Sequence, residues 1–167
     1  MKNLTDKEFE QVIFENQLLI LKICSIYCES QADKDDLFQE IMINLWKGLR
    51  SYRGESKLST WIYRVGLNTA ISGFKKRKRS PFIQTEELPE HSIDPKLQAN
   101  QNEEVKILYH AISMLKPIDK AIALLYLEER KYDEIAEIIG ISEKNVSVRI
   151  VRLKKKLEQI ITKQLGG

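Results

Sequence analysis

The chain has 167 residues, of which 43% are hydrophobic and 31% are charged, and its formal net charge is +3. This balance excludes a wholly disordered chain, and the 7 glycines and 4 prolines exclude a collagen-like or proline-rich sequence. No apolar run approaches the roughly 20 residues of a membrane helix and no signal-like segment begins the chain, so we expect a cytoplasmic protein without membrane insertion.

The first fifty residues have the apolar spacing of α-helices. Thr5 and Glu8 have the spacing of a capping box, which predicts a helix start at this point. A second helix is expected to begin near Asp33. Its apolar stripe consists of Leu37, Ile41, Leu45 and Leu49. Cys24 and Cys28 lack a second ligand pair at metal-site spacing, so we interpret them as small core or half-buried residues on one helix face.

Acidic and amide groups cluster on one side of this second helix, at Asp36, Gln39 and Glu40. Carboxylates so close to a helix N-terminus can simply complement the helix dipole. The same groups can instead form a docking surface for a basic or apolar partner. The residues alone leave both interpretations open.

A third helix is predicted to begin with Ser59 as its cap and to end near Lys78. Two aromatic side chains near its start, Trp61 and Tyr63, precede a strongly basic end. The polar and basic residues that accompany them are Arg64, Asn68, Thr69, Lys75, Lys76, Arg77, Lys78 and Arg79. Aromatic rings stack on unpaired bases and cations follow phosphates, which favours single-stranded nucleic acid as a ligand. The alternative is that the aromatic side chains belong to the core and that the cations form a solvated helix end. For Trp61 we favour the core.

The helical pattern stops over residues 80–100, where three of the four prolines interrupt it. Residues 81–104 carry one cation and six acidic groups, so this stretch cannot bury enough apolar surface to offset the entropy of ordering it. We therefore predict a flexible linker between two small helical domains, residues 1–79 and 101–167.

Four further helices are expected after the linker, approximately over residues 101–115, 117–127, 132–139 and 142–165. No segment alternates with the period of two that a half-buried strand requires. The predicted fold class is all-α, with two small helical domains.

Residues 132–150 have the pattern of a helix-turn-helix. Gly140 can end the first helix in the left-handed conformation, and Ser142 can cap the second. The residues expected to face inward are Ile135, Ala136, Ile139, Val146, Ile150 and Leu153. The outward face of the second helix then carries Lys144, Asn145, Ser147, Val148, Arg149 and Arg152, followed by Lys155. Such a face suits a DNA major groove, and the alternative is a helical hairpin with a solvated basic side.

Together these stretches resemble the extracytoplasmic-function group of bacterial RNA polymerase sigma factors, in the same order and over nearly the whole chain. Asp36-Leu37-Phe38-Gln39-Glu40 resembles the family's D-L-x-Q-E core-binding helix. Ser59-Thr60-Trp61-Ile62-Tyr63-Arg64 followed by Asn68 resembles its promoter-opening signature, T-W-L-Y-R-I-A-x-N. Tyr132-Asp133-Glu134-Ile135-Ala136 and the helix after it resemble its reader of the upstream promoter element.

The resemblance implies a sigma-2 domain over residues 1–79 and a sigma-4 domain over residues 101–167. It implies that core polymerase is bound by Asp36, Leu37, Gln39 and Glu40. It implies that the minus-ten element is contacted and opened by Tyr63, Arg64, Asn68, Thr69, Lys75, Lys76 and Arg77. It implies that the minus-thirty-five element is read by Lys144, Asn145, Ser147, Val148, Arg149, Arg152 and Lys155.

The expected partners are core RNA polymerase, promoter DNA and an anti-sigma factor, with no cofactor, metal or small-molecule substrate.

A stand-alone helix-turn-helix regulator with an N-terminal partner-binding domain would explain residues 101–167 equally well. It would not explain the order of the motifs that precede them. Because the sequence contains no phosphate-binding glycine loop, metal-spaced cluster or nucleophile elbow, we do not expect an enzyme.

Overall fold

The computed structural model describes residues 5–79 and 102–166, apart from the side chains of residues 74–79. All regular secondary structure in this part of the chain is helical, which confirms the all-α prediction. None of the described helices is both long enough and apolar enough to cross a bilayer.

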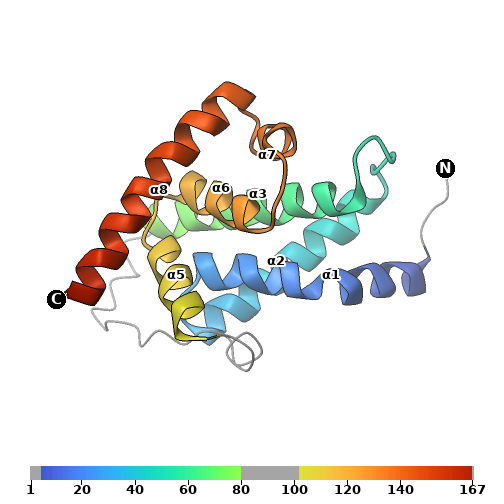
Figure 1. Ribbon diagram of the computed structural model, residues 1–167. Helices are drawn as coiled ribbons and strands as arrows, with labels where there is room; N and C mark the ends of the chain where they lie inside the picture. The colour runs from blue at the N-terminus through green and yellow to red at the C-terminus, as the bar shows by residue number, and fades with distance from the viewer. Residues whose placement is uncertain (1–4, 80–101, 167) are drawn as a thin grey trace. The chain divides into compact units, whose positions relative to one another are not determined.

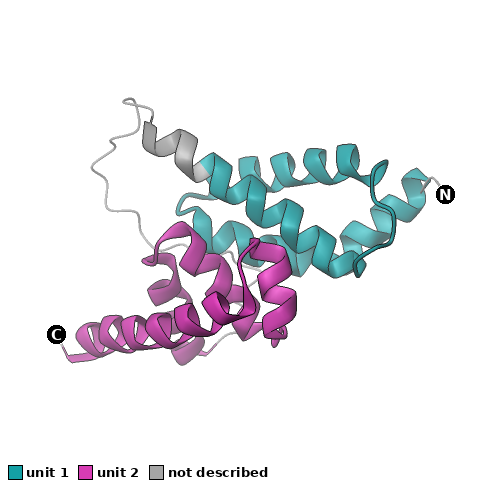
Figure 2. Ribbon diagram, turned by 90° about the horizontal axis from the view of Figure 1, so that it is seen from above, with its two compact units in different colours: residues 1–88 teal, residues 89–167 magenta. Residues whose placement is uncertain are grey.

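The chain divides into two compact units, residues 1–88 and 89–167, which Figure 2 colours separately. The boundary between the units falls inside the predicted linker over residues 80–100, which itself lies outside the described residues. Each unit has its own helices, labelled α1 to α3 and α5 to α8 in Figure 1.

The first unit contains α1 (Asp6–Tyr27), α2 (Gln31–Leu49) and α3 (Leu58–Arg79), each packed against the other two. α1 begins with the predicted capping box, in which the Glu8 N–H donates to Thr5 Oγ1 over 3.3 Å and the Thr5 N–H donates to Glu8 Oε2 over 2.8 Å. The largest buried side chains of this unit are Ile20, Ile23, Ile26, Ile41, Leu45, Ile62, Tyr63 and Leu67.

Two helices of this unit begin earlier than the sequence predicts. The N-cap of α2 is Ser30, whose Oγ accepts from the Asp33 N–H over 3.1 Å, so Asp33 lies within the first turn. α3 begins one residue before Ser59, and the carbonyl of Lys57 already accepts a helical hydrogen bond. The prediction that Ser59 caps α3 is therefore wrong.

Glycines allow the helices of the first unit to approach closely. A Cβ atom at Gly66 would lie 2.9 Å from Ile23 Cδ1, because α3 runs directly against α1 at this point. A Cβ atom at Gly48 of α2 would lie 3.0 Å from Trp61 Cζ2 of α3. The contacts at these two positions leave little room for a larger residue.

The two cysteines belong to the core of the first unit, as predicted. Cys24 and Cys28 are both buried, and neither is part of a disulfide. Among the residues that the structure describes, no group of three or more His, Cys, Asp and Glu side chains could hold a metal ion.

The second unit contains α5 (Glu103–Ser113), α6 (Pro117–Leu127), α7 (Tyr132–Ile139) and α8 (Glu143–Gly166), close to the four predicted helices. α8 is the longest of them and packs against the other three. The core residues of this unit include Ile112, Ile122, Leu124, Leu125, Ile135, Val146 and Ile150.

The turn between α7 and α8 has the predicted helix-turn-helix chemistry. Gly140 is left-handed, with a φ of 82°, and ends α7. Ser142 Oγ accepts from the Asn145 N–H over 3.1 Å and thereby caps α8. α7 packs against both α6 and α8, with Ile138 buried and Ile139 half-buried. Of the three α7 residues predicted to face inward, Ile135 and Ala136 are buried and Ile139 is less so.

Candidate nucleic-acid interface

α8 exposes most of the residues predicted to contact the minus-thirty-five element. Val146, Ile150 and Leu153 are buried, as predicted, and they determine which side of the helix faces the core. The exposed predicted residues are Lys144, Asn145, Ser147, Val148, Arg152 and Lys155. Amide, hydroxyl and guanidinium groups on one exposed helix face can form hydrogen bonds to base edges in a major groove.

Arg149, predicted for the same contact, is bound by a residue of α6. Its Nη1 atom lies 3.3 Å from Asp119 Oδ1, and the two side chains are 41% and 22% exposed. The pair has no local sequence signal, because its members lie 30 positions apart and meet only through the packing of α6 against α8. Asp119 therefore orients the Arg149 guanidinium at the edge of the exposed face.

The neighbouring cations Lys154 and Lys155 have different surroundings. Lys154 Nζ lies 4.6 Å from the centre of the Tyr126 ring. A hydrogen bond with Tyr126 raises the pKa of Lys154 above its ordinary value, so the ammonium stays charged beside this ring. Both lysines are exposed, but because the Lys154 ammonium lies against the Tyr126 ring, Lys155 is the better placed of the two to contact a DNA phosphate.

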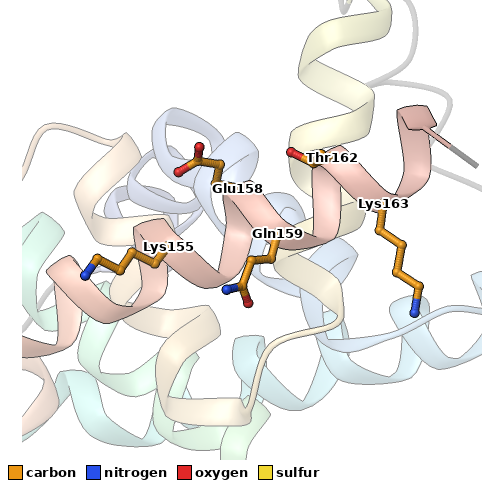
Figure 3. A pocket seen from close by; sticks show the side chains of 5 residues that line it. All are labelled: Lys155, Glu158, Gln159, Thr162 and Lys163. Carbon is orange, nitrogen blue, oxygen red and sulfur yellow. The ribbon is translucent and has the colours of Figure 1, made fainter.

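Side chains on the C-terminal half of α8 line a shallow hollow of about 500 Å³. The described residues around it are Lys155, Glu158, Gln159, Thr162 and Lys163, shown in Figure 3. Their mixed charge and the absence of aromatic groups among these five give the hollow no chemistry suited to a particular small ligand.

α2 exposes three of the four residues predicted to bind core polymerase. Asp36, Gln39 and Glu40 are exposed in the second and third turns of the helix. Leu37 is only 3% exposed and belongs to the core of the unit, so the exposed group consists of the other three residues, and the polymerase contact expected of Leu37 stays a prediction. Ile43, which sequence reasoning missed, is 52% exposed about one turn beyond Gln39 and Glu40. Its signal is an apolar side chain lying off the buried stripe of Leu37, Ile41 and Leu45.

α3 buries two of the residues predicted to contact the minus-ten element. Tyr63 is 1% exposed, so a DNA base cannot reach its ring in this conformation. Thr69 is also buried, and its Oγ1 donates to the Val65 carbonyl over 2.7 Å and accepts from Asn44 Nδ2 over 2.9 Å. Tyr63 thus fills the core and Thr69 links α2 to α3, and the DNA contacts expected of these two residues stay predictions.

Two of the other predicted minus-ten residues have described side chains, and neither is buried. Asn68 is exposed and Arg64 is half-buried. Trp61 is half-buried too, and its ring centre lies 5.2 Å from that of Tyr52, in agreement with the packing role favoured for it. The side chains predicted to follow phosphates, those of Lys75, Lys76 and Arg77, lie outside the described part of the structure.

Two family models match the chain, in the order that the motifs predict. The model of Sigma-70 region 2 matches residues 13–80 and that of Sigma-70, region 4 matches residues 106–157. The first match contains the exposed groups of α2 and α3, and the second contains the helix-turn-helix.

Similar proteins are found over almost the full length of the chain. The ECF RNA polymerase sigma-E factor of Haemophilus influenzae is 28% identical, over 93% of this chain and 88% of the relative. The ECF RNA polymerase sigma-E factor of Escherichia coli is also 28% identical, over 91% of this chain and 85% of the relative. A crystal structure of the sigma factor RpoE with the anti-sigma factor NepR from Bartonella quintana has a similar fold, with a TM-score of 0.75 and 19% identity over 93% of this chain and 98% of that one.

Proposed function

This chain belongs to the extracytoplasmic-function group of the sigma-70 family, and we propose that its separate exposed polar faces each perform a different part of the function of a sigma factor. Sigma factors are non-enzymatic subunits that bind core RNA polymerase and direct promoter recognition at initiation, and this is the function of the chain. The proposal concerns which residues perform each part of it, in a sigma-2 domain over residues 1–79 and a sigma-4 domain over residues 101–167.

The docking surface for core polymerase consists of Asp36, Gln39 and Glu40 on α2. Their exposure supports this assignment, and the exposed Ile43 extends the surface by an apolar contact. Acidic groups beside an exposed apolar side chain suit a partner surface that is basic, where charge complementarity accelerates association and fixes the orientation of docking.

Strand opening at the minus-ten element depends on Asn68 and Arg64 on α3, followed by the cations Lys75, Lys76 and Arg77. The exposed amide of Asn68 can form hydrogen bonds to the edge of an unpaired base. A run of cations at the end of the same helix can follow the phosphates of the displaced strand.

Recognition of the minus-thirty-five element depends on α8. The single observation that carries this assignment is the separation of α8 into a buried stripe, formed by Val146, Ile150 and Leu153, and an exposed basic face. We assign base contacts to Ser147 and Arg152, and phosphate contact to Lys155. The other contributors are Lys144, Asn145, Val148 and Arg149.

An anti-sigma factor is proposed as a further partner. The solved relative from Bartonella quintana is bound to one. In this chain, Phe14 and Leu18 of α1 are 68% and 50% exposed, which leaves apolar surface for such a partner.

We also assign the protein to the cytoplasm, where bacterial RNA polymerase works.

Charge reversal on α2 tests the proposed docking surface. The double variant Asp36→Lys with Glu40→Lys is expected to bind core polymerase at least about tenfold more weakly, equivalent to about 1.4 kcal/mol. Competition against the unmodified chain for core polymerase measures this loss. Glu10→Lys with Glu158→Lys makes the same charge change at two other exposed positions and should compete normally. If the α2 variant competes as well as this control, α2 is not the docking surface.

A further inference from the structure

Two exposed valines occupy the centre of the outward face of α8. Val148 is 40% exposed and Val151 is 55% exposed, although valine is among the residues most often buried. They lie three positions apart and are therefore neighbours on the helix surface. Both are on the side opposite the buried stripe of Val146, Ile150 and Leu153.

The charges around the valines indicate that a polyanion covers them. Lys144 lies about one turn before Val148, and Lys155 lies about one turn after Val151. Both lysines are exposed, and the helix contains no acidic residue between them. Cations on both sides of an apolar centre match the two phosphate backbones that border a DNA groove, with the valines directed to the groove floor.

We propose that Val148 and Val151 recognise the 5-methyl groups of thymines in the upstream promoter element. Thymine is the standard base that presents an apolar group in the major groove, and the γ-methyls of valine can contact it. A valine offers no hydrogen bond, so a polar base edge opposite it would lose its water without compensation. The α8 face thus selects thymine at two positions.

This inference rests on the proposed role of α8 as the reader of the upstream element, and it makes that role more specific. Arg152 and Ser147 select bases by hydrogen bonds, whereas the two valines select them by a methyl group. Val151 was not among the residues that the sequence pattern singled out, since an apolar residue on a helix is first attributed to the core.

Replacing thymine by uracil tests the proposal, because uracil keeps every base-pairing group and lacks the methyl group. Holoenzyme reconstituted from the full chain and core RNA polymerase is selected on a duplex library with a randomised upstream element. The enriched element is then resynthesised with uracil at one thymine position at a time. We expect affinity to fall about fourfold at each of two positions, the equivalent of exposing one buried methylene-sized group.

The variants Val148→Ala and Val151→Ala assign each methyl contact to a residue. Alanine is the best helix former, and both sites are exposed, so these variants keep the fold. Each variant should bind the thymine and uracil forms equally at one of the two positions and keep the discrimination at the other. Leu165→Ala, an exposed apolar truncation at the far end of α8, should retain both.

The possible results separate this inference from the function on which it rests. Selection of a defined upstream element with equal affinity for thymine and uracil overturns the methyl contacts and leaves α8 as the reader. Discrimination that persists in both valine variants also overturns them, because another group must then contact the methyls. Enrichment of no upstream sequence at all overturns the proposed role of α8 itself.

Discussion

α3 and α8 both carry residues that the sequence predicts to contact DNA, but the two helices expose very different shares of them. α3 lies against α1 and α2 on different sides, so a broad arc of its surface is buried, Tyr63 and Thr69 included. α8 contacts its neighbours mainly along one narrow stripe, and most of its predicted contacts remain exposed.

This difference shows when a helical pattern predicts exposure. An apolar stripe identifies the buried side of a helix if the helix has core on one side only. In α3 the buried arc includes aromatic, hydroxyl and glycine residues, so the type of a side chain no longer indicates whether the residue is buried or exposed. Aromatic and polar residues beside a basic run are then compatible with either a binding surface or a core.

The largest effect should come from enlarging a residue where α3 meets α1. Gly66→Leu places new atoms against Ile23 and is expected to lower the free energy of unfolding of the first unit by about 1–3 kcal/mol. Both tryptophans, Trp46 and Trp61, lie in this unit, so tryptophan fluorescence during urea unfolding reports on it selectively. Ser72→Leu, at an exposed position of the same helix, should change stability by less than about 0.5 kcal/mol. Equal stability of the two variants would contradict the broad burial of α3.

An effect of similar size, on recognition instead of folding, is expected on α8. Arg152→Ala should cost roughly 1–3 kcal/mol of binding to the best upstream element and relax the preference at one position. Binding of the holoenzyme to single-substitution variants of the element measures both quantities. Lys163→Ala removes an exposed cation further along α8 and should leave base preference unchanged. If Arg152→Ala changes only the salt dependence of binding, Arg152 contacts the backbone and its assignment is wrong.

A smaller effect separates the two adjacent lysines of α8. Lys155→Ala should weaken binding to all sequences alike and lower the slope of log affinity against log salt by about one unit. Lys154→Ala should change the slope less, because the Lys154 ammonium lies against the Tyr126 ring. Titration of the holoenzyme with promoter DNA at several salt concentrations gives the slopes. Equal slopes for the two variants would show that the contact with Tyr126 does not keep the Lys154 ammonium from binding a DNA phosphate.

Local chemistry was predictable from the sequence where a few neighbouring residues determine it. The capping box of Thr5 and Glu8 and the turn between Gly140 and Ser142 have the predicted roles, since each depends on backbone groups only a few positions away. The buried stripe of α8 was predictable for a similar reason. Its residues repeat at the helical period and face a core on one side.

The features that could not be predicted depend on contacts between helices. The burial of Tyr63 requires α1 and α2 to lie against α3, and its sequence neighbours carry no sign of this. The pairing of Arg149 with Asp119 and of Lys154 with Tyr126 joins α8 to α6 in the same way. These contacts identify which of the predicted residues remain available for DNA.

Strand opening provides the most direct test that the exposed part of α3 and the exposed face of α8 have separate roles. Permanganate footprinting of holoenzyme on promoter DNA compares the unmodified chain with Asn68→Ala on α3 and with Arg152→Ala on α8, each at a saturating concentration. We expect Asn68→Ala to bind the upstream element normally and to reduce the reactivity of unpaired thymines near the minus-ten element, whereas Arg152→Ala weakens binding and, once bound, leaves that reactivity intact. Unchanged thymine reactivity in Asn68→Ala, or an equal loss in both variants, would contradict this division of roles.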